Sequence, residues 1–252
     1  MRDNSIDQAP RGTLGTVRNA VLLLNLLSEG AAHQQLSDLS ERSGLSLPTV
    51  HRLLRSLTVA GLVEQDPVSS RYGLGAELVR LSERYLARLP VSRAVAPFLV
   101  ELRNSTKATV LAAVLARGCV IYVDRVDGED PGGVFREPLR MRPAFESAAG
   151  RLLSARGGAD TWKEAIGTAN GQTFTVDDRK RWAEAPCVVM IDDHAHGMSE
   201  VAVPITTAYG ATIASLVATG NVDEYPEDVM VEQVAPKLTR AAAAASRALS
   251  HG

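Results

Sequence analysis

The chain has 252 residues, enough for one large domain or two small ones. Apolar residues make up 45% of it and charged residues 22%, close to the average of globular proteins, so the composition excludes a disordered or fibrous chain. The formal net charge of −2 argues against a protein that binds polyanions over its whole surface.

Three features of the sequence concern the compartment. The apolar run from Ala20 to Leu27 is far shorter than the roughly 20 residues that a membrane helix needs. The polar segment Met1 to Ser5 carries charges of both signs and does not resemble a secretory signal. Two cysteines, Cys119 and Cys187, cannot build a disulfide framework, which fits a reducing environment. We therefore expect a soluble cytoplasmic protein without a membrane partner.

The first third of the chain predicts a series of short helices. Residues 1–12 are polar and without periodicity, which predicts a disordered tail. A helix from residue 16 to Gly30 follows, since apolar residues recur in it at three- and four-residue spacing. A second helix contains two leucines and ends at Gly44. A third runs from residue 47 to Ala60, with Ser46 placed as its N-cap and Pro48 in its first turn, where a missing N–H costs nothing.

Two short strands and a fourth helix come next. Residues 62–65 and 71–74 flank a turn cluster of Asp, Pro and Ser, which predicts a β-hairpin. Three short helices followed by a hairpin are typical of a winged helix-turn-helix. A further helix is predicted from Gly75 to Leu89, and Pro90 is expected to end it.

The remainder of the chain mixes helices and strands, which implies an α+β domain with one antiparallel sheet. Helices are expected at 93–104, 147–155 and 228–250. Strands are expected at 109–115, 120–126, 200–205 and 211–218, the first two joined by a turn at Arg117-Gly118.

The third helix is the candidate element for reading DNA. On a helical wheel its core face consists of four apolar residues, Val50, Leu53, Leu54 and Leu57. Arginines lie on the opposite side, as they would on any solvated helix, so this face alone is weak support. Its position is the stronger argument, because the helix after a short glycine-containing turn is the one that enters the major groove.

Reach and chemistry assign the individual contacts. Arg52 can bind a guanine edge with two hydrogen bonds, and Thr49 can touch a thymine methyl group or a phosphate. Arg55 and His51 lie farther along or to the side and are expected to meet phosphates. Arg71, at the base of the hairpin, is placed to reach the DNA backbone or the minor groove. The predicted DNA-binding set is Pro48, Thr49, His51, Arg52, Arg55 and Arg71.

Several segments resemble the IclR family of bacterial transcription regulators. They are 45–54 (LSLPTVHRLL), 61–67 (GLVEQDP) and 71–75 (RYGLG), then Pro143 with 147–153 (SAAGRLL), and Gly197 with 201–204 (VAVP). The match runs in order from about residue 14 to the end of the chain. The resemblance implies a winged helix-turn-helix at 13–75, a linker helix that pairs two chains at 76–90, and a GAF-like α+β effector-binding domain with an antiparallel sheet at 91–252. It also implies dimers, or dimers of dimers, on palindromic double-stranded DNA operators.

The family places its effector pocket between the sheet and the loop before the helix that carries the Ala-Gly motif. Carried over by position, the resemblance implies an effector-binding set of Val134, Phe145, Ser147, Ala148, Ala149, Met198, Glu200, Val217 and Thr219. Three of these residues depart from the family pattern. Phe145 stands where histidine is common, Glu200 where cysteine is common, and Val217 where small hydroxyl residues are common.

Glu200 bears on the kind of effector. The family binds small organic acids, and a carboxylate beside Glu200 would meet like-charge repulsion in a partly dry pocket. Glu200 is therefore protonated, or it points out of the pocket, or the ligand is neutral or cationic. Alternation with Met198 favours an inward side chain, and an edge-strand glutamate facing solvent stays as the other interpretation.

We expect a sequence-specific transcription regulator, most simply a repressor, whose operator binding a small molecule modulates through the dimer geometry. A first alternative is a regulator of the same fold with a closed pocket. A second is an enzyme domain fused to a DNA-binding module, and the sequence argues against it because it holds no nucleophile elbow and no phosphate loop. Neither a cofactor nor a metal is expected, since Cys187, His194 and His196 near Asp192 and Asp193 match no metal motif.

Overall fold

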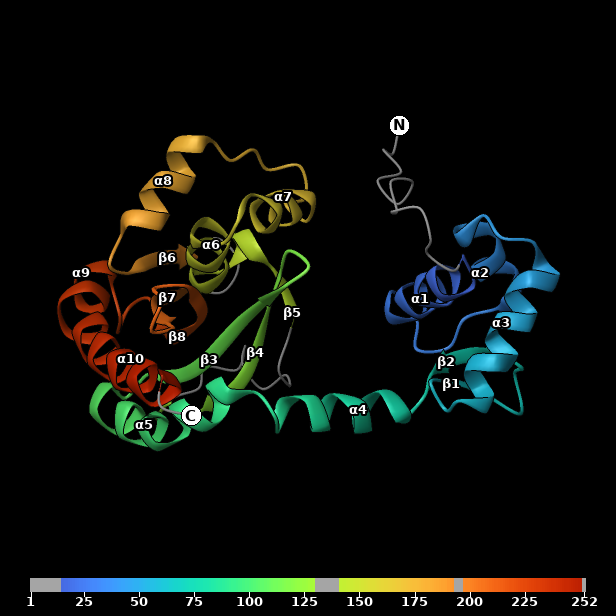
Figure 1. The fold of residues 1–252 in the computed structure, drawn as a ribbon, viewed down its shortest axis with the longest axis horizontal. Helices are drawn as coiled ribbons and strands as arrows, with labels where there is room; N and C mark the ends of the chain where they lie inside the picture. Colours follow the sequence, from blue (N-terminus) through green and yellow to red (C-terminus); the bar gives the residue numbers. More distant parts are fainter. Residues whose placement is uncertain (1–14, 130–140, 193–196, 251–252) are drawn as a thin grey trace. The chain divides into compact units, whose positions relative to one another are not determined.

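The computed structural model describes residues 15–129, 141–192 and 197–250 (Figure 1). The tail predicted at 1–12 and Val134 lie outside the described residues. Contacts within the chain group it into two compact units, Met1–Ala87 and Arg88–Gly252. In the described part of the chain, no helix combines the length and the hydropathy of a membrane span.

The first unit contains four helices and a two-stranded sheet in its described part. In chain order these elements are α1 (Gly15–Ser28), α2 (Leu36–Ser43), α3 (Leu47–Val59), β1 (Val63–Gln65), β2 (Tyr72–Leu74) and α4 (Glu77–Leu86). The side chains at its core come from all three of the first helices and from both strands: Leu23, Leu27, Leu39, Val50, Leu53, Leu54, Leu57, Val63 and Tyr72. The apolar face predicted for the third helix is therefore the face that packs into the core, because its four residues are all buried.

The turn between α2 and α3 sets the direction of the third helix. Gly44 has a φ of 68°, which L side chains adopt at a cost, and its N–H bonds to the carbonyl oxygen of Glu41 at 3.3 Å. Pro48 lies in the first turn of α3 as expected, whereas the Ser46 side chain makes no capping bond to the backbone. Its hydroxyl lies 2.8 Å from that of Thr49 instead.

Gln34 connects the helices to the wing, as the hairpin of β1 and β2 is called here. Its backbone exchanges two hydrogen bonds with Tyr72, each 2.9 Å long. Its side-chain Nε2 donates to the carbonyl oxygens of Leu26 and Glu29, at 2.9 and 2.7 Å, at the end of α1. Its Oε1 accepts from Nη1 of Arg42 at 2.7 Å, so the buried side-chain amide joins α1 to α2, while the backbone of the same residue joins them to the wing.

The fourth helix is shorter than predicted, because α4 ends at Leu86. Pro90 does not end it but begins the next helix, α5 (Pro90–Thr106). A proline is well suited to the first turn of a helix, since its missing N–H would have no intrahelical partner there.

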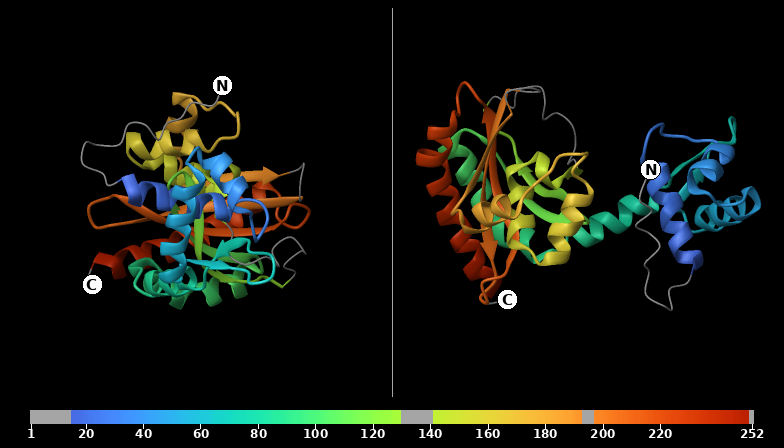
Figure 2. Two further views of the ribbon diagram at one scale, coloured as in Figure 1. Left: turned by 90° about the vertical axis from the view of Figure 1, so that its right-hand side faces the viewer. Right: turned by 90° about the horizontal axis from the view of Figure 1, so that it is seen from above.

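In its described residues, the second unit is a six-stranded antiparallel sheet with helices on both faces (Figures 1 and 2). Its strand order is β5-β4-β3-β8-β7-β6. The strands are β3 (Thr109–Ala116), β4 (Cys119–Val126), β5 (Met141–Pro143), β6 (Val188–Asp192), β7 (Met198–Thr206) and β8 (Thr212–Asn221). One face packs against α6 (Ala148–Arg156), beside which lies α8 (Val176–Glu184). The other face packs against α5 and α10 (Ala235–Ser250).

Several elements of this unit differ from the predicted ones. Four elements, β5, β6, α7 (Ala159–Gly167) and α8, were not expected from the sequence. The long helix expected at 228–250 is divided into α9 (Glu227–Val229), a π-helical turn (Met230–Val234) and α10. The antiparallel sheet itself is as predicted, including the turn at Arg117-Gly118 between β3 and β4.

Candidate DNA-binding helix and effector site

The outer face of α3 presents the basic residues that the sequence analysis selected. Pro48, His51, Arg52 and Arg55 are all exposed, and they alternate along the helix with the buried core residues. Thr49 is half-buried, and its hydroxyl already bonds to Ser46. The helix thus brings five of the six predicted residues together on one element.

The charge around this face has a single sign. From Ser43 to Val63 the chain contains His51, Arg52 and Arg55 but no aspartate or glutamate. A helix face that bears only positive side chains attracts phosphates, whatever the net charge of the whole protein. The chain therefore has a local basic surface on α3 although its formal net charge is −2.

The sixth predicted residue, Arg71, is exposed at the base of the wing. The turn before it is ordered by Asp66, whose carboxylate accepts hydrogen bonds from the N–H groups of Val68 and Ser69, at 3.2 and 3.1 Å. It also accepts a bond from the hydroxyl of Ser69, and these bonds hold the pKa of Asp66 below its ordinary value. The wing tip is thus held by its own side chains while Arg71 points to solvent.

The candidate effector residues lie on the α6 side of the sheet or at the start of α6. Ser147, Ala148 and Ala149 form the N-terminus of α6, and Ser147 caps it by accepting the N–H of Gly150 on its hydroxyl at 3.0 Å. Gly150 permits this arrangement, because a Cβ there would lie 2.0 Å from the carbonyl oxygen of Ala144. The Ala-Gly motif therefore allows the first turn of α6 to lie close to the turn that precedes it.

Glu200 reaches this helix terminus from β7. It is only 4% exposed, and its Oε1 accepts the N–H of Ala149 at 3.2 Å. Burial raises the pKa of the Glu200 carboxyl, while the N–H groups of Ala149 and Ala148 and the positive charges of Arg142 and Arg151 oppose that rise. The Glu200 side chain therefore points inward, between the sheet and α6, and the alternative prediction that it faces solvent is wrong.

Three residues near Glu200 were missed by the sequence analysis. Tyr122 is buried, and burial together with the charge of Glu200 raises the pKa of its phenol, while hydrogen bonds with Ser147 and Arg142 oppose the rise. Burial lowers the pKa of Arg151, and Glu200 counteracts this. Tyr122 lies two residues after Val120 on β4, so the two side chains share the buried face of the strand, and the inward position of Tyr122 could have been predicted from this pattern. Arg142 and Arg151 carried no such signal.

Phe145 belongs to an aromatic cluster rather than to an open cavity wall. Its ring centroid lies 4.0 Å from that of Phe174, 5.1 Å from that of Trp162 and 5.8 Å from that of Trp182. Arg151 lies over the ring of Trp182, with its Cζ 5.3 Å from the ring centroid. Both tryptophans of the chain are in this cluster. The residue that replaces the family's common histidine thus anchors the packing of α6, α7 and α8.

The other predicted effector residues are placed along β7 and β8. Thr219 pairs with Glu200 across these strands, and its hydroxyl donates to the carbonyl oxygen of Ser199 at 2.9 Å. Val217 is fully buried in the core beneath α6, and Met198 is half-buried at the start of β7. Among residues 15–129, 141–192 and 197–250 no group of three metal-ligating side chains occurs; His194 and His196 lie outside the described residues.

Known proteins share both the helix-turn-helix and the whole fold. A model of the IclR helix-turn-helix domain matches residues 16–67. The glycerol operon regulatory protein of Streptomyces griseus is 28% identical over 251 residues, which cover 94% of this chain and 97% of that protein. The chain belongs to the IclR family.

Solved structures extend the likeness of this IclR-family chain to its full length. An IclR-family regulator from Brucella abortus superposes with a TM-score of 0.78, at 19% identity, over 98% of this chain and 96% of that one. An IclR homologue from Microbacterium hydrocarbonoxydans, solved with 4-hydroxybenzoate, gives a TM-score of 0.69 at 20% identity over 93% and 98% of the two chains. The match of the helix-turn-helix model and the curated relatives make the chain a DNA-binding transcription regulator and not an enzyme.

Proposed function

We propose that this IclR-family regulator binds a palindromic operator in the cytoplasm as a dimer or a dimer of dimers, and that it acts as a repressor. In this proposal α3 lies in the major groove, with Arg52 and Thr49 at base edges. His51, Arg55 and Arg71 contact the backbone. The single-signed face of α3 supports this orientation, since it is the charged surface that the helix turns away from its core.

Pairing of two chains is proposed to run through α4. No residue of this helix is buried, although Val79, Leu81 and Tyr85 are apolar or aromatic. Val79 and Tyr85 are 64% and 61% exposed, so the helix leaves apolar surface that a second chain would cover. Light scattering on a Val79→Glu variant is expected to report a smaller assembly than that of the unaltered protein.

The proposed effector is a neutral or cationic small molecule that binds beside Glu200. The observation that carries this proposal is the buried carboxylate at the N-terminus of α6. The free N–H groups at a helix N-terminus favour an acceptor, and here the protein supplies one itself. An organic acid would compete with Glu200 for the same N–H groups and be repelled by its charge, whereas a ligand with N–H donors would gain an acceptor.

Regulation would follow from linkage between the two units. A ligand that binds one dimer geometry better than another shifts the population toward it and so changes the spacing of the two recognition helices. The homologue solved with 4-hydroxybenzoate supports a ligand-responsive fold, although that ligand carries a carboxylate. The different ligand class proposed for this chain therefore rests on Glu200 alone.

A second candidate function is a ligand-independent regulator of the same fold. The burial of the predicted pocket residues favours it, since Phe145, Ala148, Ala149 and Val217 are between 0 and 1% exposed. In that case operator occupancy would depend only on the amount of protein.

The DNA-binding part is tested with an operator selected from a random duplex library by the protein itself. Arg52→Ala is expected to weaken binding to this operator by about 1–3 kcal/mol, the scale of one base contact, with much less effect on unrelated duplex DNA. Arg117→Ala is the matched control, an exposed arginine of the second unit, outside both α3 and the proposed pairing helix α4. Equal titration curves for Arg52→Ala and the unaltered protein would exclude the assigned role.

The effector part is tested by thermal shift and tryptophan fluorescence, since both tryptophans surround Phe145 next to Ser147. The panel contains aromatic amines, neutral aromatic alcohols and benzoates. A ligand at about 100 times its Kd adds about 2.7 kcal/mol, a rise of several degrees in Tm. An amine or alcohol that acts on the unaltered protein but less on Glu200→Gln supports the proposal. A response to benzoates alone contradicts the ligand class, and no response at all favours the ligand-independent regulator.

A further inference from the structure

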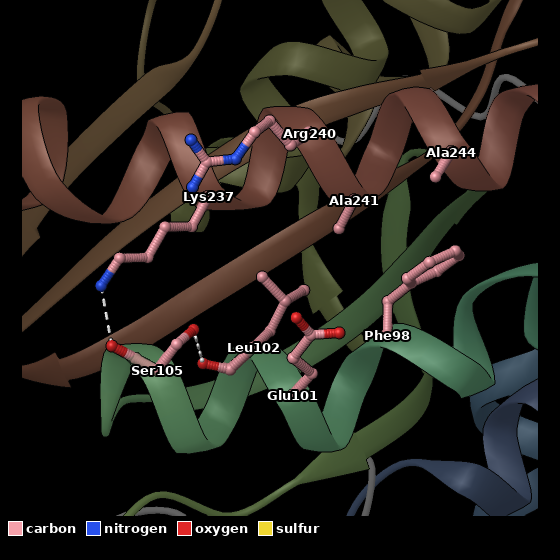
Figure 3. Close-up of a pocket in the computed structure, with 8 residues that line it drawn as sticks. All are labelled: Phe98, Glu101, Leu102, Ser105, Lys237, Arg240, Ala241 and Ala244. Atoms are coloured by element: carbon pink, nitrogen blue, oxygen red, sulfur yellow. Dashed lines mark hydrogen bonds between the residues drawn. The ribbon is translucent and has the colours of Figure 1, made fainter.

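A groove lies on the side of the sheet opposite Glu200, between α5 and α10 (Figure 3). Its volume is about 300 Å³, at the lower end of the range for small-molecule sites. The groove exists because α10 is rich in alanine where it faces α5. Ala241 and Ala244 line it on the α10 side, and their methyl groups are too short to fill the space opposite Phe98. The alanines therefore shape a surface in addition to favouring the helix.

One end of the groove is apolar. Phe98 is half-buried and projects beneath Ala244, whereas Leu102, which is buried, lies farther along α5 toward Ser105 (Figure 3). A side chain placed between Phe98 and Ala241 would cover apolar surface on both walls of the groove, which favours an apolar group there.

The other end of the groove is basic. Lys237 reaches across from α10 and donates from Nζ to the carbonyl oxygen of Ser105 at 2.7 Å, which closes this end (Figure 3). Arg240 extends toward the same end and is exposed. Lys237 and Arg240 of α10 thus place two positive charges at the end of the groove that is formed by the C-terminus of α5.

A single carboxylate lies between the two ends. Glu101 rises from α5 into the middle of the groove and is exposed (Figure 3). Within the described chain it forms no ion pair of 4 Å or less, and neither does Arg240. Along the groove the order is therefore basic, acidic and apolar.

We propose that this groove binds a free α-amino acid with an apolar side chain. Its carboxylate lies at Lys237 and Arg240, its ammonium group at Glu101 and its side chain against Phe98. An α-amino acid carries an anionic, a cationic and an apolar group on one carbon, so it offers each charge of the groove an opposite one and the apolar end an apolar side chain. This site is separate from the effector site proposed beside Glu200.

The test uses calorimetry and thermal shift on the full chain with L-leucine and L-phenylalanine. Binding of both is expected, while 4-methylpentanoate lacks the ammonium group and isoamylamine lacks the carboxylate, so each is expected to bind at least tenfold more weakly than leucine. Glu101→Gln is expected to remove the preference for leucine over 4-methylpentanoate. Arg240→Ala is expected to weaken the binding of leucine and to leave the binding of isoamylamine unchanged.

A steric pair of variants locates the site. Ala244→Leu fills the groove with a good helix former and is expected to abolish binding, whereas Ala243→Leu, on the exposed side of the same helix, is expected to preserve it. Absence of heat and of any shift with millimolar leucine or phenylalanine would overturn the proposal, as would equal binding by Ala244→Leu. Binding that survives in Ala244→Leu and changes tryptophan fluorescence would place the amino acid on the α6 side instead.

Discussion

The two units differ in where the proposed functional residues lie: on the surface in the first unit and in the interior in the second. In the first unit the cations of α3 lie on the surface, and the core beneath them consists of apolar side chains. In the second unit Glu200, Tyr122 and Ser147 lie inside, between the sheet and α6. An exposed site can be altered without cost to the fold, whereas a buried one is tied to the stability of its unit.

The largest effect is expected on the inner side of α3. Leu54→Ala removes a fully buried side chain and should lower the free energy of unfolding by about 2–5 kcal/mol, which is visible in thermal denaturation of the first unit. Val59→Ala is the control on the same helix, since Val59 is 86% exposed and its truncation should leave Tm nearly unchanged. Equal losses in both variants would contradict the assigned core face.

A smaller loss is expected for the buried side-chain amide of Gln34, which joins the end of α1 to α2. Gln34→Ala leaves carbonyl groups at the end of α1 without their donor and Arg42 without its acceptor, which should cost about 1–3 kcal/mol. Gln35→Ala, at an exposed neighbour, provides the comparison. If denaturation curves of the two variants coincide, the amide does not join these elements.

Glu200 connects the function of the second unit to its stability through pH. Because its folded pKa is raised, protonation stabilises the fold below the unfolded value, and this contribution is lost as pH rises through the folded value. Glu200→Gln cannot ionise, so its Tm should exceed that of the unaltered protein by about 2–4 °C at pH 8, the change that 1 kcal/mol produces in a unit of this size. The gap should close near pH 4.

Glu232→Gln, an exposed carboxylate in the π-helical turn, is the control for this pH series. A Glu200→Gln variant less stable than the unaltered protein at pH 8 would show that the ionised carboxylate stabilises the N-terminus of α6.

The smallest effect is expected on the outer side of α3. Arg55→Ala should weaken binding to specific and unrelated duplexes alike and lower the slope of log K against log salt by about 1, as expected for one phosphate contact. Its Tm should not change, in contrast to the adjacent Leu54→Ala. A loss confined to the selected operator would instead make Arg55 a base-reading residue.

The first unit could be predicted almost completely from its sequence. Its helices are amphipathic, so one periodicity identifies both the core and the outer face of α3. Gln34 escaped prediction, because a single polar residue before a helix gives no sign that its side chain will turn inward. Pro90 was assigned to the wrong helix, since a proline is compatible both with the residue after one helix and with the first turn of the next.

The second unit was predicted only in outline. Polar and charged residues dominate Val176–Glu184, and most of this helix is exposed apart from Trp182, so α8 has no apolar stripe of helical period. The three-residue strand β5 is too short to show alternation. The contacts of Glu200 with Ala149, and its proximity to Arg142 and Arg151, depend on pairing between distant segments, which spacing along the chain does not reveal.

The short outer strands of the sheet have a consequence for solubility. Within the part of the chain that the structure describes, the inner strands β3, β4, β7 and β8 have 8, 8, 9 and 10 residues, whereas the edge strands β5 and β6 have 3 and 5. A long, unpaired edge invites strand addition from another molecule, and β5 limits this both by its length and by Pro143, which has no N–H to donate. The apolar inner strands are thus kept from aggregation by the two shortest strands of the sheet.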